Sequence, residues 1–140
     1  MSRPGLGFGM RHVALFVRDL AACEHFYVDL LGMEVEWRPD DHNVYLTSGG
    51  DNVALHQAEP GMQRDETTQR LDHIGFFLDS AEAVDHWFAW LHSQQVRIRS
   101  EPRDHRDGAR SFYCYDPDGT LVQMIHHPEV SQWEQLKGLN

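Results

Sequence analysis

Two histidines stand at the same point of two similar stretches of the chain. His12 is followed by a run of apolar residues at 13–17, and His73, 61 residues later, by a similar run at 74–78. Short runs rich in Val, Ile and Phe are typical of buried strands. A neutral imidazole suits Fe, Mn, Co, Ni and Zn alike, and the chain contains ten histidines. The repeated histidine therefore makes metal binding the first chemistry to consider.

The surrounding pattern places each histidine at the start of a unit with one helix and four strands. In the first unit, Asp19 is the expected N-cap of a helix that Gly32 ends, and Ser80 caps the second helix. The strands are predicted at residues 10–17, 35–37, 43–47 and 53–57, and again at 73–78, 96–99, 110–115 and 121–125. Residues 39–41 are expected to form a turn and residues 101–109 a long polar loop.

The order β-α-β-β-β thus occurs twice, which predicts an α+β fold with two βαβββ modules in tandem that form a cupped mixed sheet. The modules span residues 10–58 and 71–127 within a single domain, the size that 140 residues favour. Residues 58–70 are polar and predict a linker or lid. Residues 128–140 are predicted to form a C-terminal tail with a short helix from Pro128 to about residue 136.

Composition narrows the class of protein. The apolar fraction of 41% indicates a globular chain, and the net charge of −10 argues against nucleic acid and anionic membranes, which both favour basic surfaces. No apolar segment has the length of a signal peptide or a membrane span. Cys23 and Cys114 are too few and too far apart for a disulfide framework or a four-cysteine zinc site. We expect reduced cysteines and a cytoplasmic protein.

Several motifs resemble those of the vicinal oxygen chelate superfamily, which includes glyoxalase I, the fosfomycin and bleomycin resistance proteins and the extradiol dioxygenases. The motifs are His-Val-Ala-Leu-Phe-Val-Arg-Asp-Leu at 12–20, Phe-Tyr-Val-Asp-Leu-Leu-Gly-Met at 26–33, Leu-Asp-His-Ile-Gly-Phe at 71–76 and Phe-Tyr-Cys-Tyr-Asp-Pro-Asp-Gly at 112–119. The resemblance covers roughly residues 10–127. It implies that each module forms half of a cup, and that the protein pairs as a homodimer with sites in one chain or shared by two.

The resemblance also implies a divalent metal held by residues of the first and last strands of each module. His12 and His73 occupy the first-strand positions. Gln123 stands where the family usually has a glutamate, and an offset of about 67 places His56 at the matching position of the first module. These four residues would give a set of neutral ligands with three nitrogens and one oxygen. Because imidazole binds several transition metals, the two histidines do not identify the metal. His56 is equally compatible with an inward-facing residue that binds no metal, and Gln123 with a weak ligand or a neighbouring hydrogen-bond donor.

Tyr113 and His105 are the candidate catalytic residues. Tyr113 lies ten residues before Gln123 and His105 lies in the preceding loop, as a tyrosine and a histidine do in the extradiol enzymes that this segment resembles. There the tyrosine would hydrogen-bond a substrate oxygen and the histidine would act as acid and base. A strand tyrosine and a solvated loop histidine are the alternative interpretation.

The predicted function is a metal-dependent enzyme that acts on a small molecule with neighbouring oxygens, with dioxygenase-like chemistry slightly preferred. Glyoxalase chemistry is less favoured, because the carboxylate bases that it uses on the fourth and eighth strands are missing. The aromatic residues Trp37, Tyr45, Phe112 and Tyr113 suit an aromatic or apolar ligand, although they are equally compatible with ordinary sheet core. The alternative is a metal-free protein that binds a drug or metabolite, as bleomycin resistance proteins do.

Overall fold

The computed structural model describes residues 1–65, 67 and 70–131. The chain divides into two compact units, Met1–Gln63 and Arg64–Asn140. In the part of the chain that is described, no helix is both long and apolar enough to cross a membrane. Residues 132–136 of the expected C-terminal helix lie outside the described residues.

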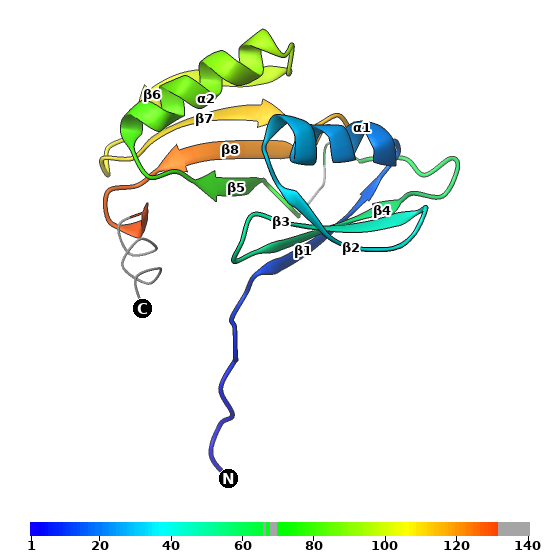
Figure 1. Ribbon diagram of the computed structural model, residues 1–140. Coiled ribbons are helices and arrows are strands. Elements are labelled where there is room, and N and C mark those ends of the chain that lie inside the picture. Colours follow the sequence, from blue (N-terminus) through cyan, green and yellow to red (C-terminus); the bar gives the residue numbers. More distant parts are fainter. Residues whose placement is uncertain (66, 68–69, 132–140) are drawn as a thin grey trace. The chain divides into compact units, whose positions relative to one another are not determined.

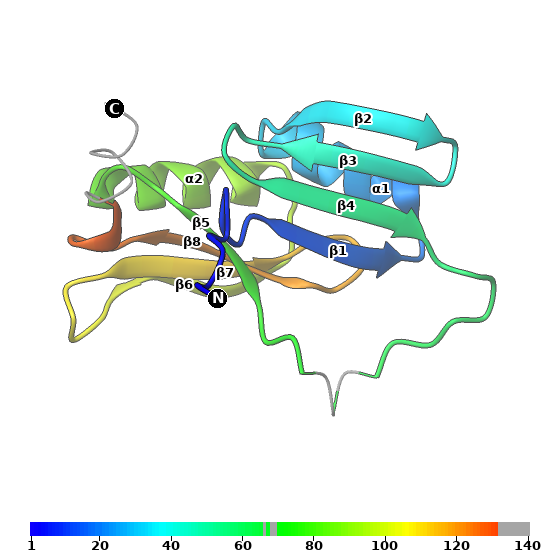
Figure 2. The same ribbon diagram turned by 90° about the horizontal axis from the view of Figure 1, so that it is seen from below.

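The first unit is a four-stranded mixed sheet with its helical segment on one face (Figures 1 and 2). Its strands lie in the order β1-β4-β3-β2, with β1 parallel to β4 and the other pairs antiparallel. The elements are β1 (His12–Val17), α1 (Leu20–Glu24), the π-helix η1 (His25–Leu30), β2 (Glu34–Asp40), β3 (Asn43–Thr47) and β4 (Asn52–Gln57).

The second unit repeats this arrangement. Its order is β5-β8-β7-β6, again with the first and last strands parallel, and α2 lies along one face of the sheet (Figure 1). The elements are β5 (Ile74–Phe77), α2 (Ala81–Ser93), β6 (Ile98–Asp104), β7 (Arg110–Tyr115) and β8 (Leu121–His126). The predicted α+β fold with two βαβββ modules is confirmed, and the strands form one sheet in each unit.

Both helices begin where the sequence predicts. The Asp19 carboxylate accepts a hydrogen bond from the backbone N–H of Ala22, and the Ser80 hydroxyl accepts one from Ala83. Such caps satisfy N–H groups that the first helical turn leaves without partners. The first helix differs from the expected form because it widens into η1, in which the adjacent rings of Phe26 and Tyr27 are both buried.

The core of each unit lies between its sheet and its helix. Alternate strand residues face the helix, and these are the apolar ones: Val17, Val44, Leu46, Val53 and Leu55 in the first unit, and Phe112, Cys114, Val122 and Met124 in the second. Burial raises the pKa of the Cys114 thiol to about 12, so this cysteine is a protonated core residue. The residues between them face away from the helix, and these carry the polar side chains considered below.

The second strand of each unit is longer than expected. β2 extends through Pro39 and Asp40, which were predicted to be a turn, and β6 extends to Asp104, into the predicted loop 101–109. Both strands are the edge strands of their sheets, and both contain irregular pairing. An edge strand tolerates proline and polar residues because one side needs no hydrogen-bond partner. β2 and β6 therefore contain Pro39 and Pro102 within their length.

Candidate functional site

Gly75, Gln123 and Tyr113 form a row across the sheet of the second unit, called the polar row below. This row lies on the face of the sheet that is opposite α2. The register pairs Gly75 of β5 with Gln123 of β8, and Gln123 with Tyr113 of β7. A Cβ atom added at Gly75 would lie 3.4 Å from the Gln123 carbonyl oxygen and 3.8 Å from its Oε1. Glycine at this position therefore leaves room beside the amide, and Gln123 stays half-buried.

His73 directly precedes β5 and lies beside the polar row. Its Nδ1 lies 2.6 Å from the Asp72 carboxylate, and its ring meets the Tyr113 ring edge to face, with centroids 5.4 Å apart. When Nδ1 donates its proton to Asp72, the lone pair of Nε2 is free to bind a metal or accept a proton. The sequence placed His73 and Tyr113 in separate roles, and the structure brings them into contact.

A hydrogen-bonded chain links His105 to Gln123. The Gln123 Nε2 group donates to the Ser111 hydroxyl at 3.1 Å, and Ser111 Oγ lies 2.9 Å from His105 Nε2. Because the amide nitrogen points to Ser111, the other amide atom, Oε1, is left for the open face. Ser111 was not singled out from the sequence, although its place two residues before Tyr113 puts both on the same face of β7.

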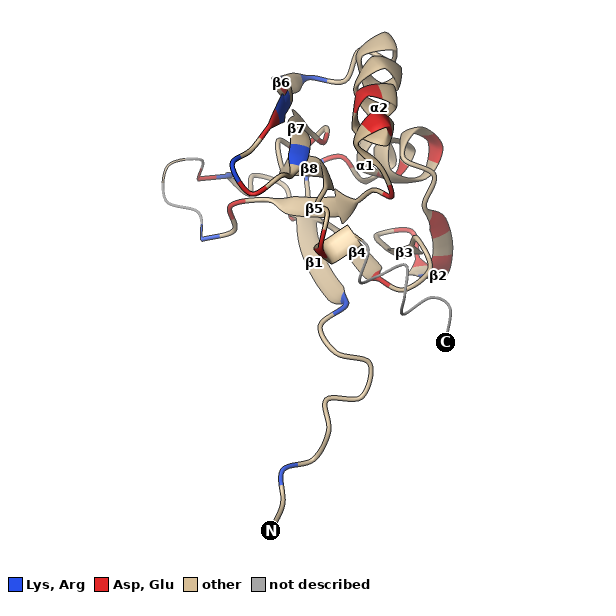
Figure 3. Ribbon diagram, turned by 90° about the vertical axis from the view of Figure 1, so that its left-hand side faces the viewer, with Lys and Arg blue, Asp and Glu red and all other residues tan. Residues whose placement is uncertain are grey.

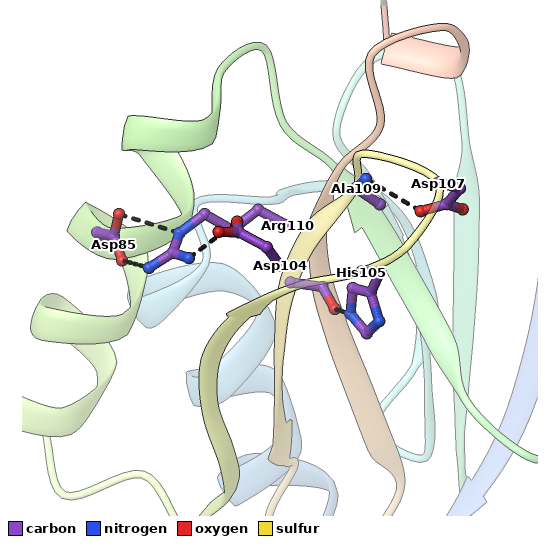
Figure 4. A network of polar contacts seen from close by, with 7 residues as sticks. Asp85, Asp104, His105, Asp107, Ala109 and Arg110 are labelled. Carbon is purple, nitrogen blue, oxygen red and sulfur yellow. Dashed lines mark hydrogen bonds and ion pairs between the residues drawn. The ribbon is translucent and has the colours of Figure 1, made fainter.

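The loop that carries His105 is anchored at both ends. The His105 N–H donates to the Ala109 carbonyl, and the Asp107 carboxylate accepts from the Ala109 N–H, which lowers the Asp107 pKa. Beyond it, the Arg110 guanidinium lies between Asp85 of α2 and Asp104 of β6 (Figure 4). The hydrogen bonds from Arg110 hold the pKa of Asp85 below its ordinary value. These contacts fix the position of His105 relative to the sheet.

The first unit holds a second histidine of the same kind. His12 Nδ1 lies 2.6 Å from the Asn52 amide oxygen, and Asn52 Nδ2 donates to the Glu36 carboxylate at 2.7 Å. The His12 ring stacks on that of Tyr45, with centroids 6.4 Å apart. As at His73, this arrangement leaves Nε2 of the imidazole free.

His56 has its own set of partners at the other end of the sheet. Its Nδ1 lies 2.5 Å from the Asn43 amide oxygen, and Asn43 Nδ2 donates to the Asp40 carboxylate. The His42 N–H and the Asn43 amide both donate to Asp40 and lower its pKa. His56 therefore repeats the His–Asn–carboxylate pattern of His12.

The strand registers correct the predicted equivalence of His56 and Gln123. Ala14 of β1 corresponds to Gly75 of β5, and Ala14 pairs with Ala54 whereas Gly75 pairs with Gln123. Ala54 is therefore the counterpart of Gln123, and His56 lies two residues further along β4. His12 pairs with Asn52, four residues from His56, which corresponds to roughly 13 Å along the strand. The structure does not bring His12 and His56 together, but it does group His73, His105, Tyr113 and Gln123 in the second unit.

The donor chemistry is compatible with a transition metal. His12 and His73 each present Nε2 with Nδ1 held by an oxygen, which is the usual arrangement of a metal-binding histidine. Gln123 adds a neutral oxygen on the face that His73 borders. Within residues 1–65, 67 and 70–131, no group of three or more His, Cys, Asp or Glu side chains could hold a metal ion. The candidate ligands His12, His73 and Gln123 are two imidazoles and an amide, and none of them is a carboxylate.

Comparison with known proteins gives consistent results. Residues 9–124 match the family model described as the Glyoxalase/Bleomycin resistance protein/Dioxygenase superfamily. The chain is 35% identical over 118 residues to a protein of Staphylococcus epidermidis named metallothiol transferase FosB. The match covers 82% of this chain and 79% of the relative.

Solved structures match at the level of the fold. A glyoxalase/dioxygenase from Nostoc punctiforme has a TM-score of 0.74 at 23% identity, covering 92% of this chain and 97% of that one. A lactoylglutathione lyase from Agrobacterium tumefaciens has a TM-score of 0.71 at 22% identity, covering 94% and 98%.

Proposed function

Because the chain belongs to the glyoxalase/bleomycin resistance protein/dioxygenase superfamily, we propose that it is a metal-dependent enzyme that acts on a small molecule. The observation that carries the proposal is the contact between His73 and Tyr113 beside Gln123, with Asp72 orienting the imidazole. The similarity to a metallothiol transferase supports the metal dependence. A bound divalent ion would act as a Lewis acid on neighbouring substrate oxygens.

The proposed ligands are Nε2 of His73 and Oε1 of Gln123 in the second unit, and Nε2 of His12 in the first unit. Each has its other polar atom held by a neighbour: Asp72, Ser111 and Asn52 respectively. His56 remains a candidate ligand, but its distance from His12 argues against a common ion for that pair. Imidazole ligands suit Fe, Mn, Co, Ni or Zn, whereas Ca and Mg prefer oxygen ligands.

Tyr113 and His105 are proposed to have different roles in the reaction. The Tyr113 hydroxyl is on the open face and would donate a hydrogen bond to a substrate oxygen. His105 Nε2 is already engaged by Ser111, which favours a role in positioning Gln123 over direct proton transfer.

The reaction class that the relatives favour is thiol transfer. The 35% identical relative is named a metallothiol transferase, whereas the preference for dioxygenase-like chemistry comes from the Ser-Phe-Tyr segment at 111–113, which resembles the extradiol enzymes. In thiol transfer, a thiolate would attack an electrophilic carbon whose departing oxygen is stabilised by positive charge. In this proposal, the Tyr113 hydroxyl would donate a hydrogen bond to such an oxygen.

Metal content is the first test. Protein purified without a histidine tag is incubated with Fe(II), Mn(II), Co(II), Ni(II) or Zn(II), desalted and measured by mass spectrometry. We expect stoichiometric retention of at least one of these metals, and its loss in His73→Ala. The control is His86→Ala, an exposed histidine on α2, which should retain the metal. Substoichiometric metal under every condition would rule out the proposal.

Activity is the second test. The metal-loaded protein is mixed with a low-molecular-weight thiol and fosfomycin as the electrophile, and the loss of free thiol is followed. In parallel, oxygen consumption is measured with catechol. Thiol loss that requires both metal and His73 would support transfer chemistry, and oxygen uptake would support the dioxygenase interpretation instead.

A metal-free binding protein is the second candidate. The observation in its favour is that Phe16 and Trp37 are 63% and 58% exposed in the first unit, where Trp37 packs on Tyr45. Exposed aromatic rings on one sheet face are suited to an apolar ligand. Quenching of tryptophan fluorescence by a ligand in protein that retains no metal would favour this function.

A further inference from the structure

A pocket of about 330 Å³ in the second unit is lined by arginines that the proposed chemistry does not use. Arg97 immediately precedes β6 and Arg99 lies within it, so both point to the same side of this edge strand. The lining also includes Arg64, Asp72, Tyr115 and Leu121. Tyr115 and Leu121 lie on the same face of the sheet as Tyr113 and Gln123.

One tyrosine ring organises the two arginines of β6. The Arg97 guanidinium lies over the face of Tyr115, with its central carbon 4.3 Å from the ring centroid. Arg99 Nη1 donates to the Tyr115 hydroxyl at 2.8 Å. A guanidinium that stacks on a ring keeps its edge N–H groups for other partners. The Tyr115 oxygen accepts from Arg99, so its own O–H is available to donate.

These two cations have no carboxylate partner among the described residues, although the chain has 22 acidic and 12 basic side chains. By contrast, Arg110 on the neighbouring strand binds both Asp85 and Asp104, and Arg64 contacts Asp118. The Asp72 carboxylate in the pocket lining is bonded to His73 Nδ1. Figure 3 shows β6 with basic and acidic residues along its length. Arg97 and Arg99 therefore form no ion pair among the described residues, in a protein whose net charge is −10.

We propose that this pocket, defined by Arg97, Arg99 and Tyr115, binds the anionic group of a small molecule, of the phosphate or carboxylate type. The two guanidinium groups and the phenol O–H can donate hydrogen bonds to the oxygens of such a group. The hydrogen bonds from the guanidinium groups are charge-assisted, and these are stronger than hydrogen bonds between neutral groups. The proposed anion site needs no metal, so its test is independent of the test of the proposed enzyme activity. Its position beside Asp72 and His73 places the bound anion next to the polar row.

The test is a titration of the protein as purified with inorganic phosphate and, separately, with succinate, at constant ionic strength, followed by two-dimensional NMR. We expect saturable shifts of the Arg97 and Arg99 Nε–H signals and of the Tyr115 amide with at least one probe. The probe that binds identifies the group. In the double variant Arg97→Gln/Arg99→Gln, the affinity should fall at least about tenfold, because both charged donors are lost.

The matched control is Arg103→Gln, an exposed arginine further along the same strand and outside the pocket. Its affinity should change less than about twofold, because an exposed charge at a distance contributes little. Single variants at Arg97 and Arg99 carry the test if the double variant does not fold. No saturable shift with either probe, or equal weakening by Arg103→Gln, would overturn the proposal.

Discussion

Gln123 is the residue on which the proposed chemistry of the second unit depends most. It occupies the position at which the family motif predicts a glutamate, and its amide is held by Ser111 with Oε1 toward the open face. An amide oxygen binds a dication more weakly than a carboxylate because it brings no charge. If Gln123 is a ligand as proposed, we expect a lower metal affinity than a glutamate would give, with an oxygen atom still offered to the metal.

Gln123→Glu should accordingly strengthen metal binding. A carboxylate beside His73 supplies the missing negative charge, and we expect affinity for Zn(II) or Mn(II) to rise at least about tenfold, measured by competition with a chelator. Adding His73→Ala to this variant should cancel the gain. If Gln123→Glu binds no more tightly than the parent, Gln123 does not face the metal.

Ser111 is predicted to be a positioning residue. Ser111→Ala removes the shared partner of Gln123 and His105, and we expect the free energy of unfolding to fall by about 1–3 kcal/mol, because buried polar groups lose their hydrogen bonds. The measurement is urea denaturation. Ser111→Thr, which keeps the hydroxyl, should lose less. Equal losses in the two variants would indicate a packing effect instead.

At the scale of elements, the ion pairs of Arg110 connect α2, β6 and β7. Because Arg110 lowers the pKa of Asp85, this pair stabilises the fold above the pKa of an unfolded aspartate, and the contribution is lost as pH falls through the lowered value. The Asp85 side chain is 50% exposed, so solvent screening limits the effect to at most about 1 kcal/mol.

Asp85→Asn should therefore be less stable than the parent at pH 7, and the difference should shrink as pH falls below about 4. Thermal unfolding at several pH values measures it, and added salt should reduce the difference at pH 7. A difference in stability that is independent of both pH and salt would show that the effect of Asp85 on stability is not due to its ion pair with Arg110.

Elements with strong local signals could be predicted from the sequence, and those set by pairing could not. The repeat of His12 and His73, the caps at Asp19 and Ser80 and the apolar alternation gave the two modules correctly. The offset between modules grows along the chain because their hairpins differ in length, and only the register identifies Ala54 as the counterpart of Gln123. Hydrogen-bond chains such as His105–Ser111–Gln123 depend on side-chain rotamers that no spacing reveals.

At the scale of the whole molecule, each unit has its own buried core between sheet and helix. We expect the secondary structure to persist without metal, with a far-UV circular dichroism spectrum that metal does not change. Metal that binds only the folded state should still raise the melting temperature in proportion to the logarithm of its concentration. His73→Ala should abolish this rise, whereas His86→Ala should preserve it.

The homodimer that the family resemblance implies is a separate prediction. Size-exclusion chromatography with light scattering should report twice the mass of the chain, and a monomer at micromolar concentration would contradict it. Exposed apolar side chains such as Val35 and Trp90, each 44% exposed, are candidates for such an interface.

The row formed by Gly75, Gln123 and Tyr113 has a counterpart in Ala14, Ala54 and Tyr45. In a symmetric assembly of single modules, every substitution would appear in both rows at once. Joining two modules in one polypeptide removes that constraint, since each copy can then mutate alone. The covalent link between the units is thus what allows one row to present an amide while the other presents only a methyl group.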